Sequence, residues 1–288
     1  MLEYMIKAAK LLVSILVIYL VTIVLLQRKM MYHPSKYPQE ISEFVKQSGL
    51  QAIRYQVANH SQVAFYQPPE SRNNPTCLWV IFGGNGAVAL GWLNFIKHFT
   101  DKEVGFLLVD YPGYGFNEGQ PSYNNNMTAA IESYKAFEAY QAAQGLQPRQ
   151  SYTLNVLGHS LGSAMSVKFA ETFTVDQLLL LSPFTSMKDM VRHIFPRIGW
   201  MLAPFLFDQY EVESGIEKLQ AQSRLGSVHM MHGLYDEVVP VEMSRSMAKR
   251  FEGFVNYEEL PNADHNFIDQ YTKKLVLTAQ QLCSGPIS

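Results

Sequence analysis

The residues of this chain with the clearest chemical potential surround one serine. Gly158-His159-Ser160-Leu161-Gly162 follows a short apolar run, and a helical pattern begins directly after it. This order is typical of a nucleophile elbow, a tight turn between a strand and a helix that exposes the serine hydroxyl. Side chains at the two glycines would clash with the neighbouring strand and helix. The pattern alone also fits an ordinary glycine-rich loop, so its partners elsewhere in the chain decide between the two.

A serine hydroxyl needs a base to take its proton, and an imidazole base needs a carboxylate that fixes its tautomer. Asp236 and His265 each lie downstream of Ser160, in loops that we expect to follow strands. Parallel strands bring such loops to the same edge of a sheet. We therefore expect Ser160, Asp236 and His265 to be nucleophile, acid and base. The alternatives are that Asp236 only caps a helix, that His265 is structural, or that Asp264 is the acid, although helix capping suits Asp264 better.

Acyl transfer also needs backbone N–H groups that point at the developing negative oxygen, each worth about 2.7–4 kcal/mol in the transition state. Leu161, directly after the serine, should provide one. The loop Gly83-Gly84-Asn85-Gly86-Ala87, which follows the apolar run Cys77–Phe82, should provide the other through Asn85. A plain glycine turn is the alternative. A phosphate-binding loop is weakly supported, because the chain lacks the lysine-containing motif that such loops carry.

These loops need a parallel sheet to bring them together. From Cys77 onward strand-like and helix-like segments alternate, which predicts an α/β domain with helices on both faces of a mostly parallel sheet. Two earlier runs predict an antiparallel pair at the sheet edge, around Asn59-His60-Ser61. The expected strands are Gln51–Val57, Gln62–Tyr66, Cys77–Phe82, Val104–Val109, Tyr152–Leu157, Leu178–Leu181, Val228–Met231 and Val255–Glu259, and the expected helices include Ile41–Gln47, Met127–Ala143 and Val241–Phe251.

An apolar run near the N-terminus predicts a membrane anchor. Leu11–Leu26 carries no charge, and it is slightly shorter than the ~20 residues that usually span a bilayer. No small-residue cleavage site follows, so residues 1–30 are expected to be an uncleaved anchor before one domain at 31–288. A cleaved signal peptide and a buried core helix are the alternatives. The flanking lysines and arginines are nearly balanced, and they slightly favour a non-cytoplasmic domain.

Composition narrows the class of protein. The 288 residues carry a net charge of −2, with 17% charged and 48% hydrophobic residues, which is typical of a globular chain and gives no indication of nucleic-acid binding. No cluster of histidines and cysteines has metal-ligand spacing, so no metal is expected. The two cysteines, Cys77 and Cys283, are interpreted as separate thiols, although a disulfide stays open.

Together these features resemble the α/β-hydrolase superfamily. Within it, the chain is similar to the membrane-anchored α/β-hydrolase-domain proteins and their bacterial relatives, which shade into prolyl-oligopeptidase-like proteins. The matching features cover most of the chain: the N-terminal apolar run, Arg28–Pro34, Gly83–Gly86, Asp110–Gly115 with Gly119–Ser122, Gly158–Gly162, Ser182–Met187, the Asp236 loop and His265-Asn266.

The resemblance implies an α/β-hydrolase fold with a small helical lid at about residues 183–225, and no cofactor or metal. It also implies the same nucleophile, acid, base and two oxyanion donors. Three positions depart from the family pattern. Gly83 replaces a histidine, which puts in doubt the hydrogen bonds that stiffen its loop; Pro112 replaces an arginine, and Asp264 a glycine.

The expected lid carries the apolar stretch 194–207. Beside a membrane anchor, an apolar lid suits an acyl chain, although these residues could instead only pack on the core. The sequence therefore predicts a membrane-anchored serine hydrolase that acts through an acyl-enzyme on an ester or thioester with an apolar acyl group. The alternatives are a serine peptidase with the same triad, and a non-catalytic relative that binds a lipid or a partner.

Overall fold

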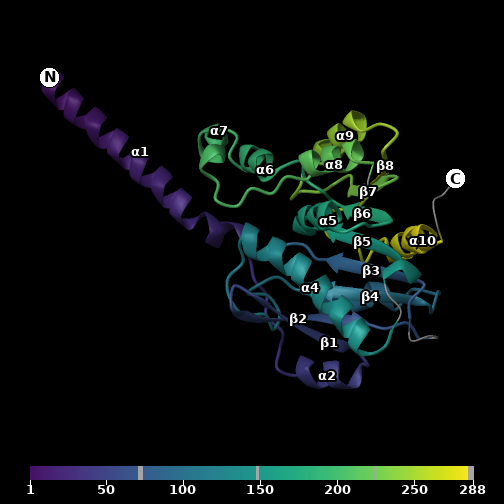
Figure 1. The fold of residues 1–288 in the computed structure, drawn as a ribbon. Coiled ribbons are helices and arrows are strands. Elements are labelled where there is room, and N and C mark those ends of the chain that lie inside the picture. The colour runs from purple at the N-terminus through teal and green to yellow at the C-terminus, as the bar shows by residue number, and fades with distance from the viewer. Residues whose placement is uncertain (71–73, 147–148, 224, 285–288) are drawn as a thin grey trace.

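A long N-terminal helix leads into a domain built on one sheet (Figure 1). The computed structural model describes residues 1–70, 74–146, 149–223 and 225–284. Over these residues, α1 (Leu2–Met31) projects away from an eight-stranded sheet. The order of strands in the sheet is β1-β2-β4-β3-β5-β6-β7-β8.

The sheet is antiparallel at one edge and parallel elsewhere. β1 and β2 form an antiparallel hairpin, and β2 also pairs antiparallel with β4. The remaining neighbours are parallel, as expected where strands and helices alternate along the chain. The strands are β1 (Gln51–Val57), β2 (His60–Gln67), β3 (Cys77–Phe82), β4 (Val104–Val109), β5 (Thr153–His159), β6 (Gln177–Leu181), β7 (Val228–Gly233) and β8 (Val255–Leu260).

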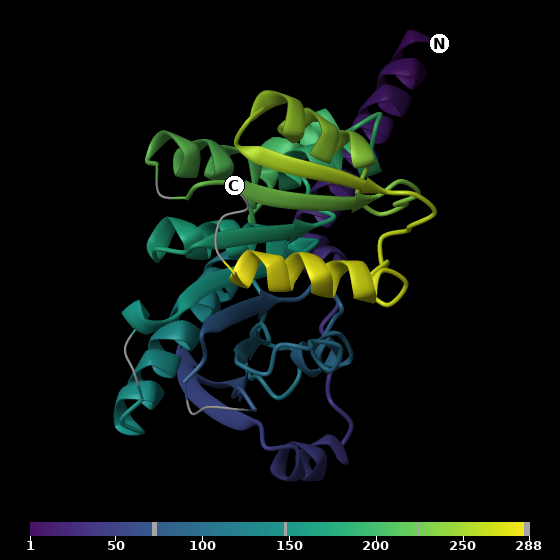
Figure 2. The ribbon, with the colours of Figure 1, turned by 90° about the vertical axis from the view of Figure 1, so that its right-hand side faces the viewer.

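Helices cover both faces of the sheet, which confirms the expected α/β architecture. One apolar core lies under α4 (Tyr123–Ala143), α5 (Leu161–Thr172), α8 (Glu213–Ala221) and α9 (Val241–Arg250). The other lies under the 3₁₀ turn η1 (Ala89–Trp92), α3 (Leu93–Ile96) and α10 (Thr272–Cys283), and Figure 2 shows α10 crossing that face. The short α2 (Ile41–Gln47) also packs against this second core.

The segment between β6 and β7 contains the expected lid. It forms α6 (Met187–Ile194), α7 (Gly199–Leu202) and the 3₁₀ turn η3 (Ala203–Phe205) before α8. Ile216 and Leu219 of α8 are fully buried in the core that α8 shares with α4, α5 and α9. Only the first part of the segment therefore stands over the carboxyl ends of the strands, and α8 is part of the domain itself.

Two of the predicted boundaries shift for local reasons. β2 begins at His60 because the hairpin turn falls on Ala58 and Asn59, both of which have positive φ, 48° and 63°. The helix predicted from Met127 begins at Tyr123, because the hydroxyl of Ser122 accepts a hydrogen bond from the Asn125 N–H at 3.2 Å and caps it.

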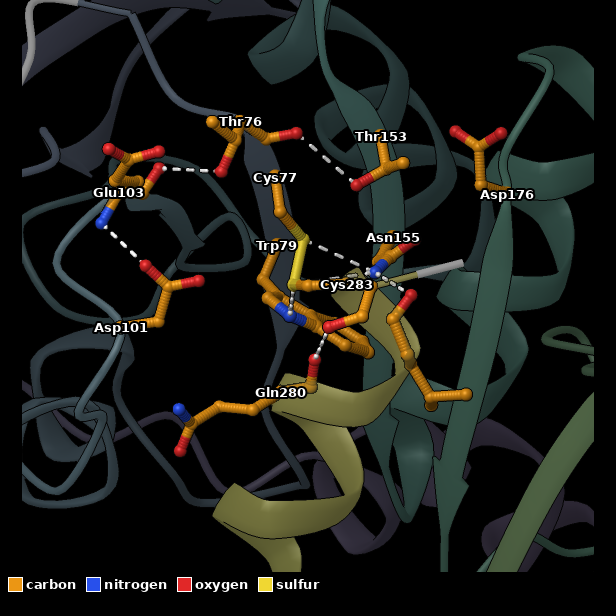
Figure 3. Close-up of a disulfide and its surroundings, with 12 residues drawn as sticks. Thr76, Cys77, Trp79, Asp101, Glu103, Thr153, Asn155, Asp176, Gln280 and Cys283 are labelled. Atoms are coloured by element: carbon orange, nitrogen blue, oxygen red, sulfur yellow. Dashed lines mark hydrogen bonds between the residues drawn. A yellow bond between two sulfur atoms is a disulfide. The ribbon is translucent and has the colours of Figure 1, made fainter. Parts of the chain in front are cut away.

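A disulfide corrects the prediction of two separate thiols. Cys77, the first residue of β3, is bonded to Cys283, the last residue of α10 (Figure 3). The indole N–H of Trp79 donates to the Cys283 sulfur at 3.2 Å, and the Asn155 amide lies 3.4 Å from the Cys77 sulfur. The bond joins residues 206 positions apart. It fastens the C-terminal helix to the centre of the sheet.

Helix α1 has the length and composition of a membrane span. Its most apolar 18-residue window has a mean hydropathy of 2.7, and none of that window is buried in the structure. This exposure rules out the alternative of a buried core helix. The predicted anchor is thus a candidate membrane span whose apolar side chains have no protein cover along most of its length.

Candidate active site

Ser160 sits at a strained turn between β5 and α5. Its φ of 53° and ψ of −117° are costly for a residue with a side chain, and such strain is typical of a functional position. Its N–H donates to the Leu181 carbonyl at 2.8 Å. A Cβ atom at Gly158 would collide with Ser166, and one at Gly162 would collide with the Phe82 carbonyl. Only glycine fits at both positions, as the elbow pattern predicts.

Asp236 and His265 meet at the same edge of the sheet. The loop after β7 carries Asp236 and the loop after β8 carries His265, and His265 Nδ1–H donates to Asp236 Oδ2 at 2.7 Å. The other carboxylate oxygen, Oδ1, accepts the N–H groups of Val238 and Val239 at 2.9 and 2.7 Å. The carboxylate is therefore held on both sides, and it can fix the imidazole with the proton on Nδ1.

His232 is a further contact of this carboxylate that sequence reasoning missed. It is fully buried at the end of β7, and its Nε2 lies 3.1 Å from Asp236 Oδ2 and 3.0 Å from the Val239 carbonyl. Its Nδ1 lies 2.7 Å from the Ser244 hydroxyl, so we assign the proton to Nε2 and let Ser244 donate to Nδ1. The only indication of this contact in the sequence was a histidine four residues before Asp236.

These contacts keep Asp236 ionised. Burial alone would raise the pKa of this carboxyl, but hydrogen bonds from His232 and His265 hold it well below its usual range. The adjacent candidate, Asp264, does not reach His265. Its carboxylate accepts the Asn266 N–H at 2.8 Å and closes a local turn, so it neither caps α10 nor replaces Asp236.

His159 contacts His265 from the side of the serine turn. Its Nε2–H donates to the His265 carbonyl at 2.9 Å, and the two rings lie 5.0 Å apart. Burial, together with the neighbouring His265, lowers the pKa of His159 to about 4. Its Nδ1 would lie 2.9 Å from a Cβ at Gly84. His159, directly before Ser160, therefore contacts both the loop after β3 and the loop that carries His265.

Two backbone N–H groups are free near the serine. Within the described part of the chain, neither the Asn85 N–H nor the Leu161 N–H donates a hydrogen bond to a protein group. Leu161 opens α5, so its N–H is among the donors that a helix leaves unpaired at its N-terminus. Both residues line the same pocket as Ser160. Both N–H groups are therefore unpaired donors in residues of this pocket, which is the kind of group that an oxyanion site uses.

Other residues stiffen the loop that lacks the family histidine. The Tyr111 hydroxyl donates to the Gly83 carbonyl at 2.6 Å. The Asn85 side chain accepts the Tyr114 hydroxyl at 2.7 Å and the His33 N–H at 3.0 Å, and donates to the Met31 carbonyl at 2.6 Å. The hydrogen bonds placed in doubt by Gly83 are thus supplied by two tyrosines and by the chain leaving α1.

An apolar pocket of about 510 Å³ contains Ser160 and His265. The structure forms no hydrogen bond between these two side chains among the residues it describes. Such bonds are often long in a free enzyme and tighten when substrate binds. Residues of α1 and of the lid supply most of the apolar lining: Ile23, Val24, Met30, Met31, Met187, Met190, Val191, Ile194, Phe195, Leu202, Phe205 and Leu206.

No group of three or more histidine, cysteine or acidic side chains in the described ranges could hold a metal ion. What the site offers is a serine in a strained turn, an imidazole fixed by a carboxylate, and two free amides at one end of an apolar pocket. This is the set of groups that acyl transfer uses.

Comparison with known proteins fits this geometry. Residues 73–224, more than half of the chain, match a family of α/β-hydrolases described as "Serine aminopeptidase, S33". The chain belongs to the α/β-hydrolase superfamily. This α/β-hydrolase is 27% identical to an uncharacterised protein of Mycobacterium tuberculosis over 266 residues, which cover 88% of this chain and 85% of that protein.

Two eukaryotic proteins are similar at the same level. Protein bem46 of Schizosaccharomyces pombe is 26% identical over 83% of this chain and 80% of its own length. Alpha/beta hydrolase domain-containing protein 17B of Homo sapiens is 26% identical over 68% of this chain and 63% of its own length. This α/β-hydrolase thus aligns with less than two thirds of the human protein.

Solved structures share the fold at lower identity. An esterase from Exiguobacterium antarcticum superposes with a TM-score of 0.58 and 14% identity, over 82% of this chain and all of the esterase. A soluble variant of monoglyceride lipase from Saccharomyces cerevisiae superposes with a TM-score of 0.59 and 12% identity, over 83% of this chain and 96% of the lipase. At these identities the likeness establishes the α/β-hydrolase fold alone.

Proposed function

We propose that this α/β-hydrolase is a membrane-anchored serine hydrolase that cleaves an ester or thioester through an acyl-enzyme. The observation that carries the proposal is the pairing of His265 with Asp236 at 2.7 Å, together with the position of His265 in the pocket that Ser160 also lines. An imidazole whose tautomer is fixed in this way has its other nitrogen, Nε2, available as a base.

The reaction follows from these positions. Ser160 Oγ attacks the carbonyl carbon while His265 Nε2 takes the hydroxyl proton, and the oxyanion is stabilised by the N–H groups of Asn85 and Leu161. His265 then gives its proton to the departing alcohol or thiol, which leaves an acyl group on Ser160. A water molecule attacks this acyl-enzyme while His265 Nε2 takes a proton from the water. The bond between the acyl carbon and Ser160 Oγ then breaks, His265 returns the proton to Oγ, and the acid is released.

The pocket lining favours an apolar acyl group. Among the described residues that line it, none is aspartate or glutamate. A serine aminopeptidase, the second candidate suggested by the description of the matching family, must hold the charged amino group of a peptide. This pocket offers that cation no carboxylate, whereas an acyl chain would be covered by methionine, leucine and phenylalanine side chains.

Covalent labelling tests the proposal. A fluorophosphonate probe should label the full-length protein in detergent, and Ser160→Ala should abolish labelling. A panel of acyl esters, acyl thioesters and aminoacyl peptides then separates the candidates, and we expect turnover of the esters or thioesters. Ligand binding without labelling, unchanged in Ser160→Ala, would show a non-catalytic binding protein instead.

The proposal also includes the side of the membrane on which the hydrolase domain lies. A disulfide such as Cys77–Cys283 persists in oxidising surroundings, and this supports a domain on the non-cytoplasmic side of the membrane with the short N-terminal tail inside. Alkylation of free thiols in intact cells, followed by reduction and a second alkylation, should recover both cysteines only in the second step. Recovery in the first step would place the domain in a reducing compartment.

A further inference from the structure

Helix α1 forms one wall of the pocket that holds Ser160. Ile23, Val24 and Gln27 line the pocket together with η3 of the lid. Ile23 and Val24 are half-buried, whereas the next residue, Leu25, is 69% exposed. A simple tether needs no such asymmetry. One face of the last turns of the candidate membrane span belongs to the substrate site.

Polar contacts fix α1 to the lid at this place. The Gln27 side chain donates to the Phe205 carbonyl at 3.2 Å and accepts the Phe207 N–H at 2.8 Å. Arg28 pairs with Asp208 at 2.8 Å, and the Asp208 side chain is only 1% exposed. These bonds set the direction of α1 relative to the pocket, so the position of the bilayer relative to the pocket is set as well.

The last turn of the apolar run contributes to the pocket. The run ends at Leu26, and the polar residues Gln27, Arg28 and Lys29 follow it. Arginine and lysine side chains are suited to the headgroup level. Val24 lies three residues before Gln27, which is about 4.5 Å along a helix. The wall formed by Ile23 and Val24 therefore lies at the edge of the hydrocarbon layer when α1 spans a membrane.

The first part of the lid carries large exposed apolar side chains. Figure 1 shows α6 and α7 close to the same end of the domain as α1. Four large side chains here are exposed: Ile194 (57%), Trp200 (67%), Phe205 (62%) and Phe207 (54%). We call these four residues the lid surface. Tryptophan and phenylalanine of this kind bind favourably at the boundary between headgroups and acyl chains.

We propose that the lid surface rests on the bilayer that holds α1, and that the substrate is an acyl lipid of this same bilayer whose chain enters the pocket along Ile23 and Val24. The inference rests on the proposed serine hydrolase activity and adds its substrate class and its direction of entry. The bonds from Gln27 and Arg28 hold Phe205 and Phe207, two residues of the lid surface, beside the helix.

Two variants of neighbouring residues test the entry path. In Val24→Phe the added ring should fill the pocket wall, whereas in Leu25→Phe the same ring should face lipid, because Leu25 does not line the pocket. The full-length proteins are compared in phosphatidylcholine nanodiscs, with p-nitrophenyl butyrate as the short ester and p-nitrophenyl palmitate as the long one. The readout is the ratio of kcat/KM for the long ester to that for the short ester.

We expect Val24→Phe to lower this ratio at least 10-fold, and Leu25→Phe to keep the wild-type ratio. An unchanged ratio in Val24→Phe, or an equal fall in both variants, would overturn the entry path, while hydrolysis of the short ester by the wild type leaves the proposed function intact. A wild type that hydrolyses neither ester overturns the proposed function and this inference together.

Trp200 reports the contact with the bilayer. The other two tryptophans, Trp79 and Trp92, are buried in the domain. Nanodiscs that contain lipids brominated on the acyl chain should quench the tryptophan fluorescence of the wild type, and Trp200→Phe should remove the quenched component. Equal fluorescence in brominated and ordinary nanodiscs would show that the lid surface stands clear of the membrane.

Discussion

The amide that replaces the carboxylate in Asp236→Asn should be held in the wrong orientation by the backbone. Asp236 Oδ1 accepts the N–H groups of Val238 and Val239, so the remaining oxygen of asparagine must take that place. Its NH₂ group then faces His265 Nδ1, where Oδ2 accepted a hydrogen bond at 2.7 Å. The imidazole can pair with this donor only if it moves its proton to Nε2, and it then has no lone pair for the Ser160 proton.

The expected loss is large and affects the chemical step. Enzymes with this arrangement lose about 10⁴-fold in kcat when the acid becomes an amide, which corresponds to ~5 kcal/mol in the barrier. His232 adds little to the loss, because its Nε2–H still has the Val239 carbonyl at 3.0 Å as an acceptor. KM for a short acyl ester should stay near the wild-type value, since Asp236 does not line the pocket.

The assay compares kcat for p-nitrophenyl butyrate and the rate of fluorophosphonate labelling in detergent. Asp264→Asn is the matched control. Asparagine can still accept the Asn266 N–H that Asp264 binds at 2.8 Å, so activity should stay within about 3-fold of wild type. A loss of less than 10-fold in Asp236→Asn refutes the assigned role of the carboxylate. Collapse of the Asp264 variant alone would transfer that role to the neighbouring acid.

Three further predictions concern other parts of the domain. Asn85→Ala removes three side-chain hydrogen bonds from an exposed position, which together stabilise the loop by ~2 kcal/mol. The variant should lower kcat about 10-fold with little change in KM. A change in KM alone would contradict a role of this side chain in placing the Asn85 N–H. Cys283→Ser opens a loop of 206 residues and should destabilise the fold by up to ~5 kcal/mol, seen as a lower Tm that reductant reproduces in the wild type; two free thiols in the unreduced wild type would disprove the bond. Burial raises the pKa of Asp110 to about 6, so the folded state holds this proton more tightly than the unfolded state does, and stability from this group is lost as pH rises from about 4 to about 6. The stability of the wild type relative to Asp110→Asn, followed by Tm, should therefore fall over that range by at most ~3 kcal/mol, and a constant Tm difference would contradict the raised pKa.

The sequence predicted the elements that position the site, because their patterns are local. The bounds of β1, β3 and β4 match the prediction, since each is a continuous or alternating apolar run between turn residues. β5 is longer than predicted and ends at His159, because its pairing with β6 continues up to the serine turn. The catalytic roles of Ser160, Asp236 and His265 stay predictions until the variants are measured.

Other features depend on contacts between distant segments, which one sequence does not encode in a readable pattern. The Cys77–Cys283 bond was wrongly interpreted as two thiols, because neither residue lies in a short cysteine motif. Gln27 follows the apolar run and belongs to no motif, yet its side chain pairs with the backbone of the lid across 178 and 180 positions. Only the tertiary structure shows that His232 contacts Asp236 and that His159 contacts His265.

The disulfide also encloses the chemistry in a covalent ring. Ser160, Asp236 and His265 all lie between Cys77 and Cys283, so one cut in any loop of that ring leaves the three side chains on a single molecule. A protease that nicks the surface loop before β7 would break the backbone without separating serine from histidine. The α1 helix lies outside the ring, so after a cut before β3 this wall of the pocket is joined to the cross-linked unit by non-covalent contacts alone.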